Sequence, residues 1–149
     1  YKIGYKKFGN YEIYPKVFYK DYGFAKDVCS MPSGSCYIEV FLIYPLLKGN
    51  KYDKNINSTI KNYFKKLRKN TSYMIDYKAN INDNIYSVIF EAKGMYADAT
   101  NLDFWYKSFN FDLNTGKLLK LKDIFPNIKK LKQKVYKALL KKYPDAFSS

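Results

Sequence analysis

The stretch from Cys36 to Lys69 reads CYIEVFLIYPLLKGNKYDKNINSTIKNYFKKLRK, and it decides the fold because its residue pattern changes period. Residues 36–44 are β-branched and aromatic on both faces, which predicts a central strand that is covered on each side. From Asp53 onward, apolar residues recur every three or four positions and lysines fill the others. That spacing predicts an amphipathic helix over 53–69, with Asp53 as its N-cap.

The segments on either side of this stretch alternate apolar and polar residues, as strands with one buried face do. Pro15 marks the first of these strands as an edge strand, because proline cannot donate to a sheet ladder. We predict turns at 80–83 and 114–117, and strands at 10–20, 72–79, 84–92, 104–113 and 118–121. In the 104–113 segment one face carries Trp105, Phe109, Phe111 and Leu113.

A second amphipathic helix is predicted from Pro126 to Lys142, where apolar residues again keep helical spacing among lysines. The order β-β-α-β-β-β-β-α is typical of the α+β class, here an antiparallel sheet with two amphipathic helices packed on it. A length of 149 residues fits a single domain over 1–149, with residues 1–10 as an N-terminal extension.

The charge of the chain favours an anionic partner. It has 27 Lys and Arg against 13 Asp and Glu, a formal net charge of +14. The positive electrostatic field of a chain with this charge attracts nucleic acid, anionic lipid or an anionic envelope polymer. A lysine-rich composition also follows from AT-biased coding DNA, so the charge leaves both explanations open. Arg68 is the single arginine, which argues against sequence-specific nucleic-acid recognition, where arginine is preferred.

Two cysteines, Cys29 and Cys36, bracket a turn-forming segment that contains Pro32 and Gly34. We expect them to form a disulfide, which by loop entropy contributes about 2.5 kcal/mol for a loop of roughly eight residues. A disulfide persists in an oxidising compartment and so predicts an extracytoplasmic chain; two free thiols are the alternative. A metal site is not expected, because the chain has no histidine and no second cysteine pair. No segment is long and apolar enough for a membrane span, and we expect any leader or anchor to lie outside this sequence.

The sequence lacks the residues of common catalytic centres. Without histidine there is no Ser-His-Asp or Cys-His arrangement, and no glycine-rich nucleotide loop is present, so neither catalytic residues nor a cofactor are expected. A pair of carboxylates could still hydrolyse a glycoside. Glu39 and Glu91 are the candidates for that alternative, because each lies within an apolar strand where a carboxylate is costly unless paired.

Two groups of residues are candidates for a binding surface. The aromatic segment 96–111 offers stacking platforms, with Tyr96, Trp105 and Tyr106 as candidates. The last helix carries the lysine candidates Lys129, Lys130, Lys134 and Lys137. That helix either lies free on an anionic membrane or phosphate backbone, or packs on the sheet and solvates its lysines. The packed arrangement would bury Ile128, Leu131, Val135 and Leu139.

Four segments carry a resemblance to a known family: NIYSVIFEAKGMY, SFNFDLNTGK, LKLKDIF and the preceding INSTIKNYFKKL. Over about positions 36–140 the chain resembles a bacterial envelope domain family of unknown function. The family includes the extracellular domain of the lysozyme-sensing anti-sigma-V factor and the accessory domain that precedes peptidoglycan deacetylase modules. The resemblance implies an exported or membrane-tethered α+β sensor or accessory module. Family members continue beyond the last helix, so we expect further strands after Ser149.

Together these observations predict a non-catalytic extracytoplasmic binding or sensor domain for an anionic cell-envelope polymer or an acidic protein. Two alternatives stay open. One is an enzyme that processes peptidoglycan or another polysaccharide, or an accessory domain of such an enzyme. The other is a nucleic-acid-binding protein.

Overall fold

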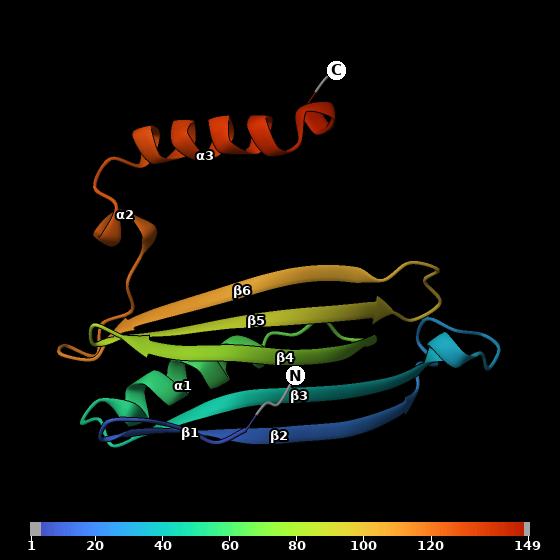
Figure 1. Ribbon diagram of the computed structural model, residues 1–149. Coiled ribbons are helices and arrows are strands. Elements are labelled where there is room, and N and C mark those ends of the chain that lie inside the picture. The colour runs from blue at the N-terminus through green and yellow to red at the C-terminus, as the bar shows by residue number, and fades with distance from the viewer. Residues whose placement is uncertain (1–3, 148–149) are drawn as a thin grey trace. The chain divides into compact units, whose positions relative to one another are not determined.

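The computed structural model describes residues 4–147, which form two compact units (Figure 1). The first unit ends at Leu118 and holds the sheet together with one long helix. The second unit begins at Leu119, and its described part is helical. Residues 6–8, which we expected in an N-terminal extension, form the first strand of the sheet.

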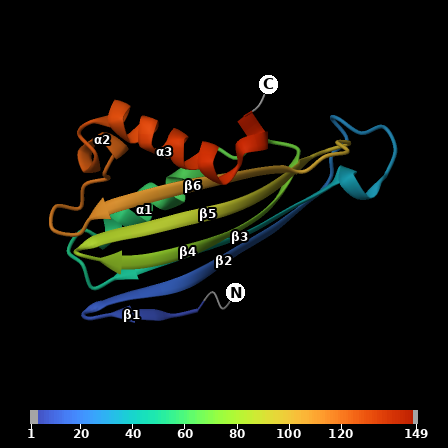
Figure 2. The same cartoon turned by 45° about the horizontal axis from the view of Figure 1, so that its top comes forward.

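Six strands form one sheet in which they lie in sequence order (Figure 2). Neighbouring strands are antiparallel except β3 and β4, which are parallel. The helix α1 (Asp53–Phe64) joins these two strands, and a helical crossover starts the next strand at the same end of the sheet. The α+β class is therefore confirmed, with a mostly antiparallel sheet. The strands are β1 (Lys6–Phe8), β2 (Tyr11–Phe24), β3 (Tyr37–Lys48), β4 (Thr71–Asn82), β5 (Ile85–Tyr96) and β6 (Asp103–Asp112).

The helix α1 lies on one face of the sheet and supplies part of its core (Figure 1). Its buried residues are Ile56, Ile60 and Phe64, at the helical spacing seen in the sequence. The side-chain amide of Asn57 fixes the helix to β3. It donates to the carbonyl oxygen of Leu47 and accepts from the N–H of Leu47, both at 2.9 Å. The predicted amphipathic helix is confirmed.

The two ends of α1 differ from the prediction. Tyr52 is the N-cap, so Asp53 lies in the first turn instead of at the cap. The reason is the preceding turn, in which the side-chain oxygen of Asn50 accepts from the N–H of Tyr52 at 2.8 Å. At the other end the helix stops at Phe64, before the predicted end at residue 69.

The hairpin between β4 and β5 is tighter than predicted. Asp83 and Asn84 have φ angles of 48° and 57°, the left-handed pair of a two-residue hairpin turn. The predicted turn at 80–83 is therefore wrong, because Ile81 continues the strand and pairs with Tyr86. Asparagine and aspartate tolerate this backbone conformation better than other residues with a side chain.

The predicted apolar face of β6 is confirmed. Phe109, Phe111 and Leu113 are buried, and the rings of Phe109 and Phe111 stack with centroids 6.2 Å apart and planes 4° apart. After β6 the chain turns as predicted at 114–117, where the N–H of Gly116 donates to the carbonyl oxygen of Asp112 at 2.7 Å. This row of rings forms one side of the core under α1.

The predicted strand at 118–121 is wrong. Leu118 forms a single bridge with Phe111, and Leu121 already begins the short helix α2 (Leu121–Ile124). The physical reason is local capping: the carboxylate of Asp123 accepts from the N–H of Lys120 at 2.7 Å, which closes a helical turn.

Much of one edge of β2 is unpaired among residues 4–147. β1 pairs only with residues 11–13 of β2, so the edge is open from Pro15 to Phe24, as the position of Pro15 predicted. β3 lies inside the sheet as expected, but its outer face is not covered. Tyr37 on that face is 51% exposed, and Glu39 is also exposed. Only the α1 side of β3 is buried as a continuous apolar surface.

Two tyrosine hydroxyl groups lie in the core without a hydrogen-bond partner among the described residues. Tyr77 of β4 and Tyr86 of β5 are 7% and 0% exposed. Burial raises the pKa of Tyr77 to about 12 and raises the pKa of Tyr86 as well. Both rings contribute apolar contact to the core, while their hydroxyls lower its stability.

The second unit consists of α2, α3 (Ile128–Lys142) and the short helix η2 (Pro144–Phe147). α3 follows Asn127, whose side-chain oxygen accepts from the N–H of Lys130 at 2.9 Å. The helix is confirmed close to its predicted bounds. Within the second unit no residue of α3 is buried, and the expected packing of this helix on the sheet stays a prediction. That expectation concerned Ile128, Leu131, Val135 and Leu139. Within residues 4–147 no helix is long and apolar enough to cross a membrane.

Candidate functional site

A cavity of about 590 Å³ lies on the α1 side of the sheet in the first unit. Its floor comes mainly from β3, with contributions from α1, β4 and the loop 65–70. β2 forms a wall, and the loops 25–27 and 65–70 form the rim. This volume is within the range of small-molecule binding sites in proteins. We call it the rim-and-floor cavity, with the apolar floor formed by Ile38, Val40, Leu42, Phe64, Leu67 and Tyr73.

The floor follows from strand geometry. Ile38, Val40 and Leu42 alternate along β3 and therefore point to the same face, toward α1. Tyr73 of β4 is in register with Val40 and extends the floor sideways. Phe64 closes it from the last turn of α1 and packs edge to face on Phe90, with centroids 4.6 Å apart. Most of the floor is thus part of the main hydrophobic core, while Ile38 belongs to the small core around the disulfide.

The rim of the cavity is cationic. Four cationic residues come from the end of α1 and the segment after it, and Lys26 faces them from the loop after β2. The carboxylate among the lining residues is that of Asp27, which pairs with Lys69 at 3.2 Å. Both partners of this ion pair are well exposed, so the pair adds little stability. The four cations of the α1 side are Lys61, Lys65, Arg68 and Lys69.

Arg68 is held in place by two tyrosines, Tyr96 and Tyr73. Its guanidinium carbon lies 4.1 Å from the ring centroid of Tyr96, a cation–π contact. Its backbone N–H donates to the hydroxyl of Tyr73 at 3.0 Å. A guanidinium presents a fixed fork of donors that matches a carboxylate or a phosphate. Arg68 therefore offers an oriented anion-binding group beside an apolar floor.

Two exposed rings line the cavity where β2 has no neighbouring strand among the described residues, and we define this side as its mouth. Phe18 and Tyr22 line it and are 42% and 55% exposed. The ammonium group of Lys20 lies 4.6 Å from the ring centroid of Tyr22. Aromatic rings left half in water at a cavity mouth are typical contact groups for a ligand.

The predicted aromatic candidates do not form one surface. Tyr106 is 67% exposed, whereas its neighbour Trp105 points to the other face and is half-buried against Tyr73. Trp105 packs on Tyr73, a lining residue of the cavity, but does not line the cavity itself. Tyr96 is near the cavity, under the guanidinium of Arg68.

The predicted lysine candidates lie elsewhere. Lys129, Lys130, Lys134 and Lys137 are exposed on α3, in the second unit, whereas the aromatic candidates belong to the first. No site within either unit joins the two sets. The cavity was not predicted from the sequence, although the run KKLRK at 65–69, which follows α1 and holds the single arginine, indicates its cationic rim.

The two candidate carboxylates do not share a cleft. Glu39 is exposed on β3 and accepts from the hydroxyl of Tyr19 at 3.0 Å, which raises the pKa of Tyr19. Glu91 lies on β5 directly opposite Asp76 of β4. Glu91, Asp76 and Tyr106 line a hollow of about 50 Å³, and Glu39 is not part of it. Glu39 and Glu91 are therefore not arranged as a hydrolytic pair.

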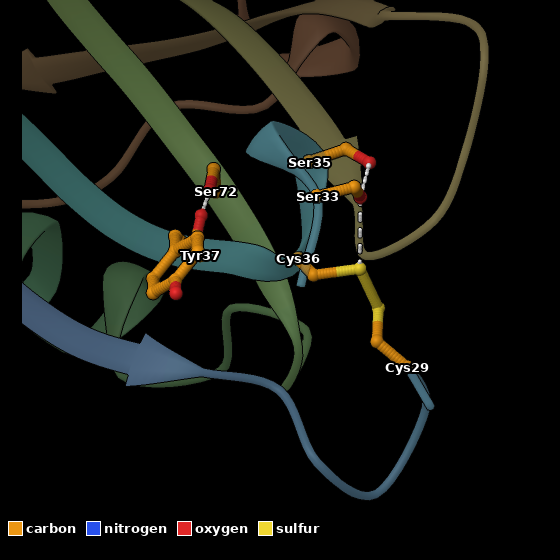
Figure 3. The surroundings of a disulfide bond; sticks show 6 residues. All are labelled: Cys29, Ser33, Ser35, Cys36, Tyr37 and Ser72. Carbon is orange, nitrogen blue, oxygen red and sulfur yellow. Dashed lines mark hydrogen bonds between the residues drawn. A yellow bond between two sulfur atoms is a disulfide. The ribbon is translucent and has the colours of Figure 1, made fainter. Parts of the chain in front are cut away.

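The predicted disulfide between Cys29 and Cys36 is present (Figure 3). The S–S distance is 2.09 Å and the Cα atoms are 6.1 Å apart. Both cysteines are buried with Ala25, Ile38 and Ala97 in a small second core. Asp98 lies near the two sulfurs, but sulfurs bonded to each other do not act as thiolate ligands for a metal ion. Ala25 and Ile38 also line the cavity, so the disulfide braces its end.

Comparison with known proteins reveals a similar fold. The chain matches the crystal structure of a DUF3298 family protein from Pseudomonas aeruginosa with a TM-score of 0.51 and 12% sequence identity. The match covers 86% of this chain and 66% of that chain, so this chain spans just under two thirds of the neighbour's length. No protein-family model matches the sequence, and no curated protein is similar to it.

At this identity the match shows a shared fold alone. The expected resemblance to a bacterial domain family of unknown function is supported at that level. None of the comparisons points to the anti-sigma-V factor or to the deacetylase accessory domain.

Proposed function

We propose that this chain is a non-catalytic, extracytoplasmic binding domain that takes an anionic ligand at the rim-and-floor cavity. One observation carries the proposal: five cationic side chains and one carboxylate surround an apolar floor in a cavity of about 590 Å³. An apolar site with a few oriented polar groups is the usual design of a ligand pocket. The excess of cations selects the sign of the ligand's charge.

The other features of the chain support the same proposal. The net charge of +14 attracts anions over a long range and raises their local concentration near the rim. The disulfide supports a location outside the cytoplasm. The partner predicted from the charge, an anionic envelope polymer or an acidic protein, would place an anionic group at Arg68. The separation of Glu39 from Glu91 removes the main support for the hydrolase alternative.

The test uses two dyes of similar shape. Anilinonaphthalene sulfonate is anionic and N-phenylnaphthylamine is neutral, and both fluoresce in apolar sites. We expect the protein to bind the anionic dye more tightly and its binding to weaken with salt. Arg68→Gln and Lys65→Gln should each lower that affinity by about fivefold to tenfold, the loss of one charge-assisted contact. Lys54→Gln is the matched control, because Lys54 lies on α1 outside the cavity lining.

The proposal fails if both dyes bind equally, or if the rim variants bind the anionic dye as the unchanged protein does. It also fails if the loss follows Lys130→Gln and Lys134→Gln on α3 and not the rim substitutions. That last result would assign binding to the lysine row of the second unit.

A further inference from the structure

We infer that the cavity takes a single-chain anionic amphiphile, with its alkyl chain along the floor and its phosphate, sulfate or carboxylate group at Arg68. This inference rests on the proposed function, and it adds the chemical class of the ligand. It names one molecule bound in a cavity and not a membrane surface.

The floor has the form of a track. Ile38, Val40 and Leu42 present three apolar side chains in a row along one face of β3. Alternate residues of a strand are about 6.7 Å apart, so the row extends over about 13 Å between its end residues. With C–C bonds of about 1.5 Å, an extended alkyl chain of roughly ten carbons covers that length. A compact polar ligand such as a sugar would leave this track without polar partners.

Most of the cationic groups of the rim come from one segment. Lys61, Lys65, Arg68 and Lys69, four of the five, lie in the continuous segment 61–69, whereas the track belongs to β3. Cations also stabilise the end of a helix, but the partial charge there is only about −0.5 and offsets part of one lysine. The remaining charge is available to a ligand. This separation into an apolar track and a cationic side matches a molecule with the same two parts.

The mouth supports a chain that enters from the side. Phe18 and Tyr22 stand on the β2 edge that has no neighbouring strand among the described residues. A chain can therefore slide in along the sheet edge without opening the core. The two rings would cover it once it is bound, which explains apolar rings that are half exposed in the free protein.

The experiment measures displacement of the anionic dye from the full chain by n-alkyl sulfates of increasing length, below their micelle-forming concentrations. Each added methylene should tighten binding by up to about fourfold, the value of one buried CH₂ group. The gain should stop near ten to twelve carbons, where the track ends. Alkyl maltosides and alkyltrimethylammonium ions of the same lengths should bind at least tenfold more weakly than the sulfates.

Two variants test separately how the ligand's charged head group and its alkyl chain contribute to binding. Arg68→Gln should lower the affinity for the alkyl sulfates by about tenfold and leave the affinity for the alkyl maltosides unchanged. Leu42→Trp should fill the track and move the plateau to shorter chains; circular dichroism and a urea transition check its fold. If that variant does not fold, Phe18→Ala at the exposed mouth serves instead, and it should weaken long chains more than short ones. Lys54→Gln should change neither series.

The outcomes distinguish this inference from the proposed function. Dye binding that depends on Arg68, together with displacement that does not depend on chain length, overturns the amphiphile and leaves the proposed function standing. An acidic peptide that displaces the dye where alkyl sulfates do not would assign the site to a protein partner. Anionic vesicles that bind the protein equally well after Leu42→Trp would assign binding to a membrane surface. Dye binding insensitive to Arg68 overturns both proposals.

Discussion

The ring of Tyr73 meets the ring of Trp105 edge to face, with centroids 5.5 Å apart and planes at 86°. Tyr73 is on β4 and Trp105 on β6, and they meet over the small residues of β5 between them. Because Tyr73 also lines the cavity, a ligand on the floor would be separated from Trp105, the only tryptophan of the chain, by the ring of Tyr73.

Binding should therefore change the fluorescence of Trp105. We expect an alkyl sulfate to shift its emission or intensity in a saturable way, with the same affinity as dye displacement. Tyr73→Phe keeps the ring contact and should keep the signal. A signal that saturates at a different concentration would show that the tryptophan reports another site.

Gly94 is required for the contact between Tyr73 and Trp105. A Cβ atom at Gly94 would lie 3.0 Å from the Tyr73 ring and 3.1 Å from the Trp105 ring. We expect Gly94→Ala to lower the free energy of unfolding by about 1–3 kcal/mol, the usual effect of overpacking. A urea transition followed by circular dichroism measures it. Gly34→Ala is the control, since no atom lies within 4 Å of its Cβ position. Equal stability of both variants would contradict this packing.

Removing a buried hydroxyl should stabilise the protein. Tyr77 and Tyr86 have no hydrogen-bond partner for their hydroxyls among residues 4–147. We expect Tyr86→Phe to raise the free energy of unfolding by about 1 kcal/mol, because the ring packing remains and an unpaired polar group is lost. Tyr73→Phe should have the opposite sign, since its hydroxyl accepts from the N–H of Arg68. A loss of stability in Tyr86→Phe would reveal a partner such as a buried water.

The buried tyrosines also predict the response to alkali. Burial raises the pKa of Tyr77 to about 12, while an unfolded tyrosine titrates near 10. Below about pH 10 both states keep the proton, so the contribution is constant. Between about pH 10 and 12 the unfolded chain loses the proton and the folded chain keeps it, so stability falls as pH rises. Urea transitions at several pH values should show this fall, and Tyr77→Phe should reduce it. An unchanged slope in that variant would contradict the assignment.

Loss of the disulfide should loosen one end of the cavity. Replacing Cys29 and Cys36 with alanine should cost about 2–3 kcal/mol, given the short loop that the bond closes. Dye affinity should fall as well, because Ala25 and Ile38 belong both to the small core around the disulfide and to the cavity lining. A reducing agent should reproduce both effects in the unchanged protein and have none in the double variant. Unchanged dye affinity after loss of the disulfide would show that the disulfide does not support the cavity.

The features that were predicted correctly are those that depend on the spacing of apolar residues along the chain. The helical spacing of Ile56 and Ile60 and the alternation around Phe111 each depend on neighbours along the chain, and both were confirmed. The turn at Asp83 was misplaced because Asn80 and Asn82 are also turn-forming residues, and only pairing of Ile81 with Tyr86 decides between them.

The cavity could not be predicted in the same way. Its lining combines β2, β3, α1 and β4, and Phe18 lies far from Arg68 along the chain. Alternation shows that Val40 faces the core side of its strand, but it does not show that the packing against α1 leaves a space there. The aromatic residues Tyr96, Trp105 and Tyr106 were predicted as a surface, although Trp105 packs on Tyr73 of the cavity lining.

The unpaired edge of β2 affects how the protein is expected to behave at high concentration. Along this edge the backbone N–H and C=O groups have no partner strand among the described residues, so a second copy could pair with it edge to edge. The exposed rings of Phe18 and Tyr22 would add apolar contact to such a pair. Lys16 and Lys20 are exposed on that same strand, so we expect their charges to oppose such pairing. Salt weakens this repulsion, so we expect self-association through this edge to increase with ionic strength.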